Sequence, residues 1–326
     1  MPKIDVAYFE SGQEKAISEI HNQAFRQWIQ LLGQLYGYRE IVPEDISSWS
    51  ADPKSTIWIV FLQGEPVGYV HCFLEERVGL RPIKSLAFVE TIEHLGQSKI
   101  AVLPAFQRKG IAEALLKVII DYYQQLGVET ATAIAYNDNI GASALFSKLG
   151  FEHKQFYYYE HYSQNDPFIQ DAVLATLDLQ APIREPKLSP NVFIRPLQEN
   201  DLSAMKAIFG ECRPDVFGKS PAHDQIEGWL HSSWAEETLV AEIDGKVVGC
   251  MEYTSSGIIG IPGVLKKYRR AGVGSTLIYH LLKAMQERGF TTALADTGCI
   301  MQDAIQMYQQ FGFNLTREQW AWVKIL

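Results

Sequence analysis

Two short basic segments that contain glycine lie at matching places in the chain. The first is Val102-Leu-Pro-Ala-Phe-Gln-Arg-Lys-Gly-Ile-Ala112, and the second is Val264-Leu-Lys-Lys-Tyr-Arg-Arg-Ala-Gly-Val-Gly274. Each stands between a predicted strand and a predicted helix. Glycine lets backbone N–H groups approach an anion, and the N-terminus of a helix adds unpaired donors. A diphosphate could bind here, although neither segment has the spacing of a Walker A or GxGxxG loop. A purely structural turn from strand to helix is the alternative.

A tyrosine and a carboxylate follow the second segment. Asp296 ends a predicted strand, and Tyr308 lies in the next predicted helix. A tyrosine hydroxyl can donate a proton and a carboxylate can accept one, so the pair could serve acid–base chemistry. A packed aromatic and a strand-end cap are the structural alternatives. Glu252, on an earlier strand, is the second candidate for the base.

The elements that must position these groups occur twice. Displacing the sequence by 162 positions aligns residues 102–151 with 264–313, with 13 identities in 50 positions and no gap. Ordinary residue frequencies would give about 3. Residues 61–68 and 242–249 also correspond, and each predicts a strand, a tight glycine turn and a second strand. We interpret the chain as a duplication in which Phe146 replaces Tyr308 in the first copy.

The copies differ in length. The first copy has about 19 additional residues around Leu74–Ser98, which we interpret as a loop or a lid. Between the copies, the prolines predict a linker over residues 166–190, with a possible short helix over Ile169–Leu179. The sequence thus predicts two domains, at residues 1–165 and 191–326, as the length of 326 residues favours.

Composition excludes several classes of protein. The net charge is −9 and the pI about 5.4, which disfavours a general nucleic-acid binder and weakly favours cationic partners such as amines. The sequence predicts no transmembrane helix and no secretory signal. The four cysteines form no CxxC pair, which predicts reduced thiols in a cytoplasmic protein without structural zinc; they are Cys72, Cys212, Cys250 and Cys299.

A second motif follows each basic segment at the same distance. It reads Asn139-Ile-Gly-Ala-Ser-Ala-Leu-Phe-Ser-Lys-Leu-Gly-Phe151 in the first copy and Met301-Gln-Asp-Ala-Ile-Gln-Met-Tyr-Gln-Gln-Phe-Gly-Phe313 in the second. The paired motifs resemble the GCN5-related N-acetyltransferase (GNAT) family in its tandem form, over some 300 residues. The resemblance implies a mixed α/β (α+β) fold with two tandem domains, each a splayed mixed sheet flanked by helices.

The resemblance also implies the ligands. Acetyl-CoA is expected as co-substrate, a primary amine of a small molecule or a peptide as acceptor, and no metal. The residues expected to hold CoA in the second copy are Val264, Arg269, Arg270, Ala271, Gly272, Val273, Gly274 and Ser275. The first copy fits the same pattern at Val102, Gln107, Arg108, Lys109, Gly110, Ile111, Ala112 and Asn139.

The resemblance assigns catalysis to the second copy. It implies that Tyr308 serves the leaving thiolate and that Asp296 stands where the ribosomal-protein acetyltransferase branch has its base. The first copy has Phe146 and Ile134 at these positions, so its site is expected to be degenerate. The second copy has Met301 where the family has Asn. A non-catalytic module that binds or senses acyl-CoA therefore stays the alternative, and both a monomer and a homodimer stay open.

Overall fold

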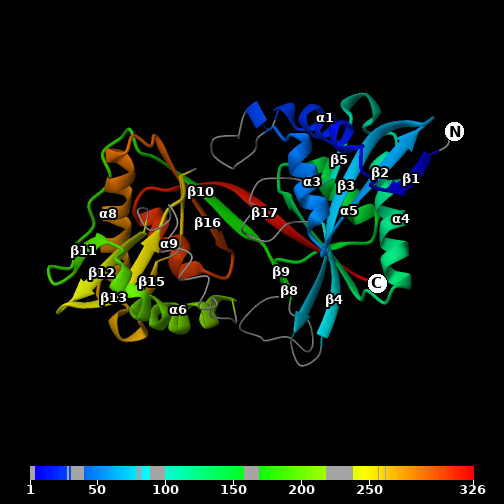
Figure 1. Cartoon of the computed structure of the whole chain (residues 1–326). Helices are drawn as coiled ribbons and strands as arrows, with labels where there is room; N and C mark the ends of the chain where they lie inside the picture. Colours follow the sequence, from blue (N-terminus) through cyan, green and yellow to red (C-terminus); the bar gives the residue numbers. More distant parts are fainter. Residues whose placement is uncertain are drawn as a thin grey trace. The chain divides into compact units, whose positions relative to one another are not determined.

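The computed structural model describes residues 4–27, 29–30, 40–78, 82–88, 100–157, 169–217, 238–255, 257–260 and 262–326. The chain divides into two compact units (Figure 1). The first unit contains residues 1–155 and 320–326, and the second contains residues 156–319.

The first unit is a mixed sheet with helices on both faces. Its strands follow the order β1-β2-β3-β4-β6, and β5 pairs with β3. The pairing of β4 with β6 is parallel. The elements are β1 (Ile4–Tyr8), α1 (Glu14–Ala24), α3 (Pro43–Ala51), β2 (Ser55–Leu62), β3 (Glu65–Val78), β4 (Pro82–Ala87), β5 (Ile100–Val102), α4 (Ile111–Gln125), β6 (Thr130–Tyr136), α5 (Ile140–Lys148) and β7 (Glu152–His153).

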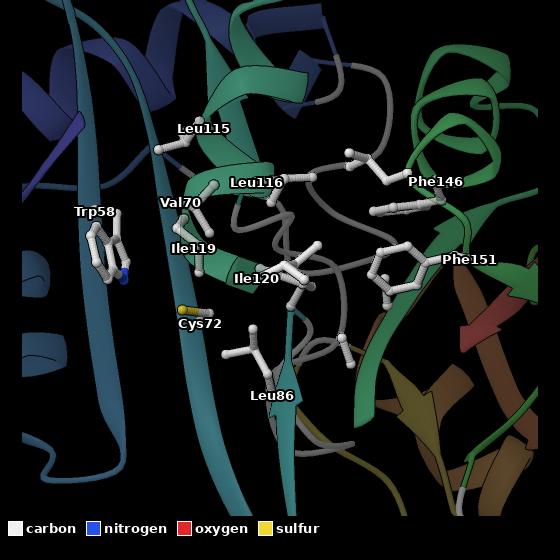
Figure 2. Packing of buried hydrophobic residues seen from close by; sticks show 14 of the residues in the cluster. Trp58, Val70, Cys72, Leu86, Leu115, Leu116, Ile119, Ile120, Phe146 and Phe151 are labelled. Carbon is white, nitrogen blue, oxygen red and sulfur yellow. The ribbon is translucent and has the colours of Figure 1, made fainter. Parts of the chain in front are cut away.

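Successive side chains of β3 point to opposite faces of the sheet and so divide the core of the first unit into two layers. Tyr69 packs with α1 and α3, whereas Val70 and Cys72 pack with α4 on the other face. Helix α4 turns Ile111, Leu115 and Ile119 toward the sheet, because residues four apart lie on one side of a helix. Figure 2 shows this second layer, in which α4 lies beside Phe146 and Phe151.

The C-terminal end of the chain completes the first unit. Strand β17 (Asn314–Ile325) begins in the second unit, and its last residues pair with β7, with Trp322 opposite His153. Trp322 is buried and its ring centroid lies 6.0 Å from that of Phe146. The core of the first unit therefore depends on residues from the far end of the sequence.

The second unit repeats the arrangement with two sheets. One has the order β17-β10-β16-β14 and the other β11-β12-β13-β15. The elements are β8 (Phe156–Tyr157), β9 (Ile169–Gln170), β10 (Ala172–Asp178), β11 (Phe193–Pro196), α6 (Leu202–Phe217), β12 (Thr238–Ile243), β13 (Lys246–Glu252), β14 (Ile258–Ile259), β15 (Gly263–Val264), α8 (Val273–Glu287), β16 (Thr292–Gly298), α9 (Gln302–Gln310) and β17. Cys250 packs with α6, and Met251 packs with α8.

One strand of the second unit is divided between its two sheets. Strand β14 pairs in parallel with β16, through Ile258 and Ile259. Strand β15 pairs with β13 instead, through Gly263 and Val264. Ile259 also bridges Tyr253, and Gly260 N donates to Glu252 O at 2.8 Å, so this stretch of chain already lies beside β13. Its pairing with β16 ends after Ile259, and the two sheets separate at this point.

The predicted mixed α/β fold is confirmed, but the region between the copies was interpreted wrongly. Residues 172–178, predicted as part of a short helix in a linker, form strand β10. This strand pairs with β16 along one edge and with β17 along the other. Hydrogen bonds to two distant strands decide the conformation, which local periodicity in a short apolar run cannot reveal.

Part of the additional segment of the first copy is also regular. The predicted loop over Leu74–Ser98 begins inside β3, which continues to Val78, and contains β4. Strand β4 pairs with both β3 and β6. Residues 79–81 and 89–98 of the predicted segment lie outside the described residues.

We predict that Trp322→Ala destabilises the first unit by about 3–5 kcal/mol, the usual cost of removing a buried tryptophan. Trp320 is only half-buried and stacks on His153, so Trp320→Ala is expected to cost less. Urea unfolding gives the free energies, and hydrogen exchange in α4 assigns the loss to the first unit. Equal small losses for both variants would contradict the role given to the C-terminal strand.

Candidate active site

The two basic glycine loops have the same backbone. Arg108 and Gly110 have φ angles of 59° and 78°, and Arg270 and Gly272 have 63° and 82°. A short 3-10 turn precedes each pair, at Pro104–Phe106 and at Lys266–Tyr268. Positive φ at the last position favours glycine, which is followed directly by α4 or α8.

A side chain of each loop binds back to the preceding strand. Gln107 Nε2 donates to Val102 O at 3.0 Å, and Arg269 Nε donates to Val264 O at 3.0 Å. The amide and the guanidinium thus make the same contact in the two copies. This bond holds the loop against the strand, so either Gln or Arg suits the position three residues before the glycine.

The N-terminus of α8 offers donors to an anion. The first intrahelical bond runs from Thr276 N to Gly272 O, at 2.9 Å, so the N–H groups of residues 273–275 have no acceptor one turn back. Helix α4 begins in the same way, with Ala114 N bonded to Gly110 O at 2.9 Å. Arg270 is exposed, two residues before the Gly272 that precedes α8. Both loops therefore have the chemistry that a diphosphate requires.

Asn139 has a structural role in this fold. Its Oδ1 accepts a hydrogen bond from Ala142 N at 3.1 Å, which caps α5. Met301 holds the same place before α9 with no side-chain bond to the helix. The replacement therefore removes a helix cap, and a contact of Asn139 with CoA remains a prediction.

Tyr308 reaches the point where the two sheets of the second unit separate. Its ring is buried on α9, and its Oη donates to Gly260 O at 3.2 Å. The Glu252 carboxylate lies against the same residue, since a Cβ atom on Gly260 would be 2.6 Å from Glu252 Oε1. Gly260 is thus required between the phenol and the carboxylate. No local feature of the sequence indicated its role.

Burial and nearby charges shift the pKa values of Tyr308 and Asp296. Burial raises the pKa of Tyr308 well above its usual value, and the charges of Glu252 and Asp296 raise it further. Burial also raises the pKa of Asp296 to about 7. Near neutral pH, Tyr308 is therefore protonated while Asp296 exchanges its proton, which suits a general acid and a general base. The two predicted catalytic residues and Glu252 do come together.

The first unit has an apolar counterpart of this site. Phe146 is buried, and the centroid of its ring lies 5.5 Å from that of Phe151. Figure 2 shows both rings in the apolar layer. The position equivalent to Glu252 is His71, because Gly68 pairs with Val102 as Gly249 pairs with Val264, and each residue follows its glycine by three positions. Extending the correspondence of residues 61–68 and 242–249 by three positions would have paired His71 with Glu252, but nothing local indicated the importance of this pair.

Other candidates for chemistry find little support. Burial raises the pKa of Cys299, which disfavours a reactive thiolate. His153 stacks on Trp320, and His94 lies outside the described residues. Within the part of the chain that the structure describes, no three His, Cys, Asp or Glu side chains form a group suited to a metal, and no helix has the length and hydropathy to span a membrane.

Comparison with known proteins gives one family. The model of the acetyltransferase (GNAT) family matches residues 15–151 and 202–313. The probable N-acetyltransferase camello of Xenopus tropicalis is 31% identical over 84 residues, which are 24% of this chain and 38% of that protein. The aligned region thus spans well under half of the length of this relative.

Solved structures share the whole fold. A GCN5-related N-acetyltransferase from Sphaerobacter thermophilus has a TM-score of 0.67 at 15% identity, over 99% of this chain and 95% of its own. A tandem GNAT protein from the clavulanic acid biosynthesis pathway also has a TM-score of 0.67, at 13% identity, over 99% and 98%. At these identities the likeness establishes the fold: two tandem domains of this kind.

We predict that Asn139→Ala lowers the free energy of unfolding by about 1 kcal/mol, because Ala142 N loses its acceptor. Asn139→Asp retains an oxygen acceptor at the cap and should stay close to the wild type. Thermal and urea unfolding of the two variants test this. If neither the Ala nor the Asp substitution changed the free energy of unfolding, the cap would contribute nothing to stability. The role of Asn139 would then have to lie in ligand binding.

Proposed function

The chain belongs to the acetyltransferase (GNAT) family, and we propose that it is an N-acetyltransferase that uses acetyl-CoA to acetylate a primary amine of a small molecule or a peptide. We place the reaction in the second unit. One observation carries this assignment: the Tyr308 hydroxyl meets Gly260 O beside the Glu252 carboxylate, where the sheets separate. Asp296 contributes a second carboxylate from β16.

The glycine loop supports the binding of acetyl-CoA. The N–H groups at the start of α8, together with Arg270 and Ala271 before Gly272, are suited to the diphosphate. Val264 ends the strand directly before the loop, so its backbone stands where the pantetheine arm would run toward the opening between the sheets. Arg269 serves as a positioning residue through its bond to Val264 O.

The first step removes a proton from the acceptor. A primary amine is largely an ammonium ion at neutral pH and must lose a proton before it can attack the thioester carbon. Asp296, with a pKa of about 7, is ionised often enough to take that proton and is basic enough to hold it. Glu252 is the second candidate, and its negative charge favours the approach of an ammonium ion.

The second step expels the thiol. As the C–N bond forms and the C–S bond breaks, the electron pair of the C–S bond remains on sulfur. Tyr308 can donate its proton to that sulfur, because its raised pKa keeps the phenol neutral. The nitrogen is positively charged once the C–N bond has formed, and it loses its second proton to solvent. The products are the N-acetyl amine, CoA with a free thiol and one released proton, and the proton held by Asp296 returns through solvent to Tyr308.

We predict that Tyr308→Phe lowers turnover by about 10²–10⁴-fold, the range for acid–base groups, with little change in acetyl-CoA affinity. The substitution removes one hydroxyl and leaves the ring that packs near Phe313. Tyr279→Phe on α8 is the matched control and should retain activity. The release of CoA thiol with a panel of amines measures turnover.

Near-wild-type turnover of Tyr308→Phe, together with loss of activity in a Gly110 variant, would move catalysis to the first unit. The absence of turnover with every amine, although acetyl-CoA binds, would favour the alternative of a non-catalytic acyl-CoA-binding module. The loss of the Asn cap at Met301 is the observation that keeps this alternative open.

The pH dependence tests the base. For the wild type, kcat/KM should rise with pH and reach half of its plateau near the pKa of Asp296, about 7. Asp296→Asn should remove the midpoint near pH 7 and leave only the rise that follows deprotonation of the amine itself. Its deficit should be greatest at about pH 7–8 and should narrow toward about pH 10, where the amine loses its proton without help. A wild-type midpoint near pH 4 would contradict the assignment of the base.

A further inference from the structure

The segment that joins the copies lies along α8 in the second unit. Gln286, near the end of α8, donates through Nε2 to Leu179 O at 2.7 Å. Ile183 and Val192 pack against the core that includes α8. The segment of residues 179–192 therefore follows the helix from its C-terminal end toward its N-terminal end. We call it the joining segment.

The joining segment reaches the second glycine loop. Ser189 N donates to Thr276 Oγ1 at 3.4 Å, and the same hydroxyl donates to Gly272 O at 2.9 Å. A Cβ atom on Gly272 would lie 3.4 Å from Ser189 Cβ. A Cβ atom on Gly110, by contrast, would meet no atom of the described residues within 4 Å. The joining segment thus covers one side of the second loop, whereas none of the residues that the structure describes covers the first loop in this way.

The charge at the second loop is also partly neutralised. Arg270 Nη2 lies 3.0 Å from Asp303 Oδ2, on the first turn of α9. The residue equivalent to Asp303 in the first copy is Gly141, which has no charge. Among the described residues, Arg108 of the first loop has no acidic partner within salt-bridge distance. Two independent features therefore weaken the second loop as a site for an anion.

We propose that the joining segment and Asp303 hold the second acyl-CoA site closed, and that the diphosphate of the incoming ligand displaces both. This inference rests on the proposed function, because it takes acyl-CoA as the ligand of the second loop. Ser189 and Asp303 thereby set the affinity of the second unit for acyl-CoA. An exposed ion pair such as Arg270–Asp303 stabilises a protein only slightly, so a diphosphate with two negative charges can replace the carboxylate.

Displacement links ligand binding to the chain between the copies. Arg184 Nη1 contacts Gln310 O at 3.5 Å, so the joining segment also touches the end of α9, the helix that carries Tyr308. Release of Ser189 from the loop frees a stretch that is bound to α8 and α9 at several points. Acyl-CoA binding is therefore expected to loosen residues 183–192 while it orders residues 270–275.

Hydrogen–deuterium exchange of the full chain, with and without saturating acetyl-CoA, tests the displacement. We expect slower exchange in residues 270–275 and about twofold or more faster exchange in residues 183–192. Slower or unchanged exchange in residues 183–192, with residues 270–275 protected, would overturn the inference and leave the proposed function intact. Unprotected residues 270–275 would overturn both.

A charge variant tests the second feature. The acetyl-CoA concentration that half-protects residues 270–275 reports the affinity of this loop alone. Asp303→Asn should lower it about two- to tenfold at low salt, and the gain should shrink at high salt, because salt screens exposed charges. Glu287→Gln removes the same charge at the opposite end of α8 and serves as the control. Equal affinities for the two variants would overturn the role of Asp303.

Discussion

The divided strand before the second glycine loop is the constraint on which the site depends. This strand pairs with β16 only as far as Ile259, whereas it lies beside β13 both at Ile259 and at Gly263. The Gly260 carbonyl in this interval is available to Tyr308, and Gly260 N bonds to Glu252 O at 2.8 Å. The chain then continues from this divergence into the loop at the start of α8. The binding and the catalysis that we propose thus depend on one structural feature.

Duplication explains why the two copies keep the loop but differ in chemistry. The backbone of each glycine loop and the bond from Gln107 or Arg269 are the same, because they stabilise the turn from strand to helix in both copies. The side chains at the point where the sheets separate do not stabilise this turn, so they can differ between the copies. Phe146 packs in an apolar core, whereas Tyr308 stands near two carboxylates that raise its pKa. One unit could therefore lose acid–base groups without loss of its fold.

Local features of the sequence predicted the elements that carry the site. The spacing of apolar residues indicated α4 and α8, and the glycine positions indicated the turns before them. Distant interactions decided what could not be predicted. Strand β10 depends on two neighbours remote in sequence, and the first unit takes its last strand from the C-terminus. The role of Gly260 follows from sheet divergence, and that of Ser189 from the path of the joining segment, which no motif encodes.

A crystal structure of the full chain with acetyl-CoA, or with its product CoA, tests most directly whether the second unit brings the thioester to Tyr308. We expect the diphosphate at the N–H groups of residues 273–275 and the sulfur within hydrogen-bonding distance of Tyr308 Oη. A ligand whose sulfur lies only beside Phe146, with the second loop unoccupied at a saturating ligand concentration, would contradict the assignment of catalysis to the second unit.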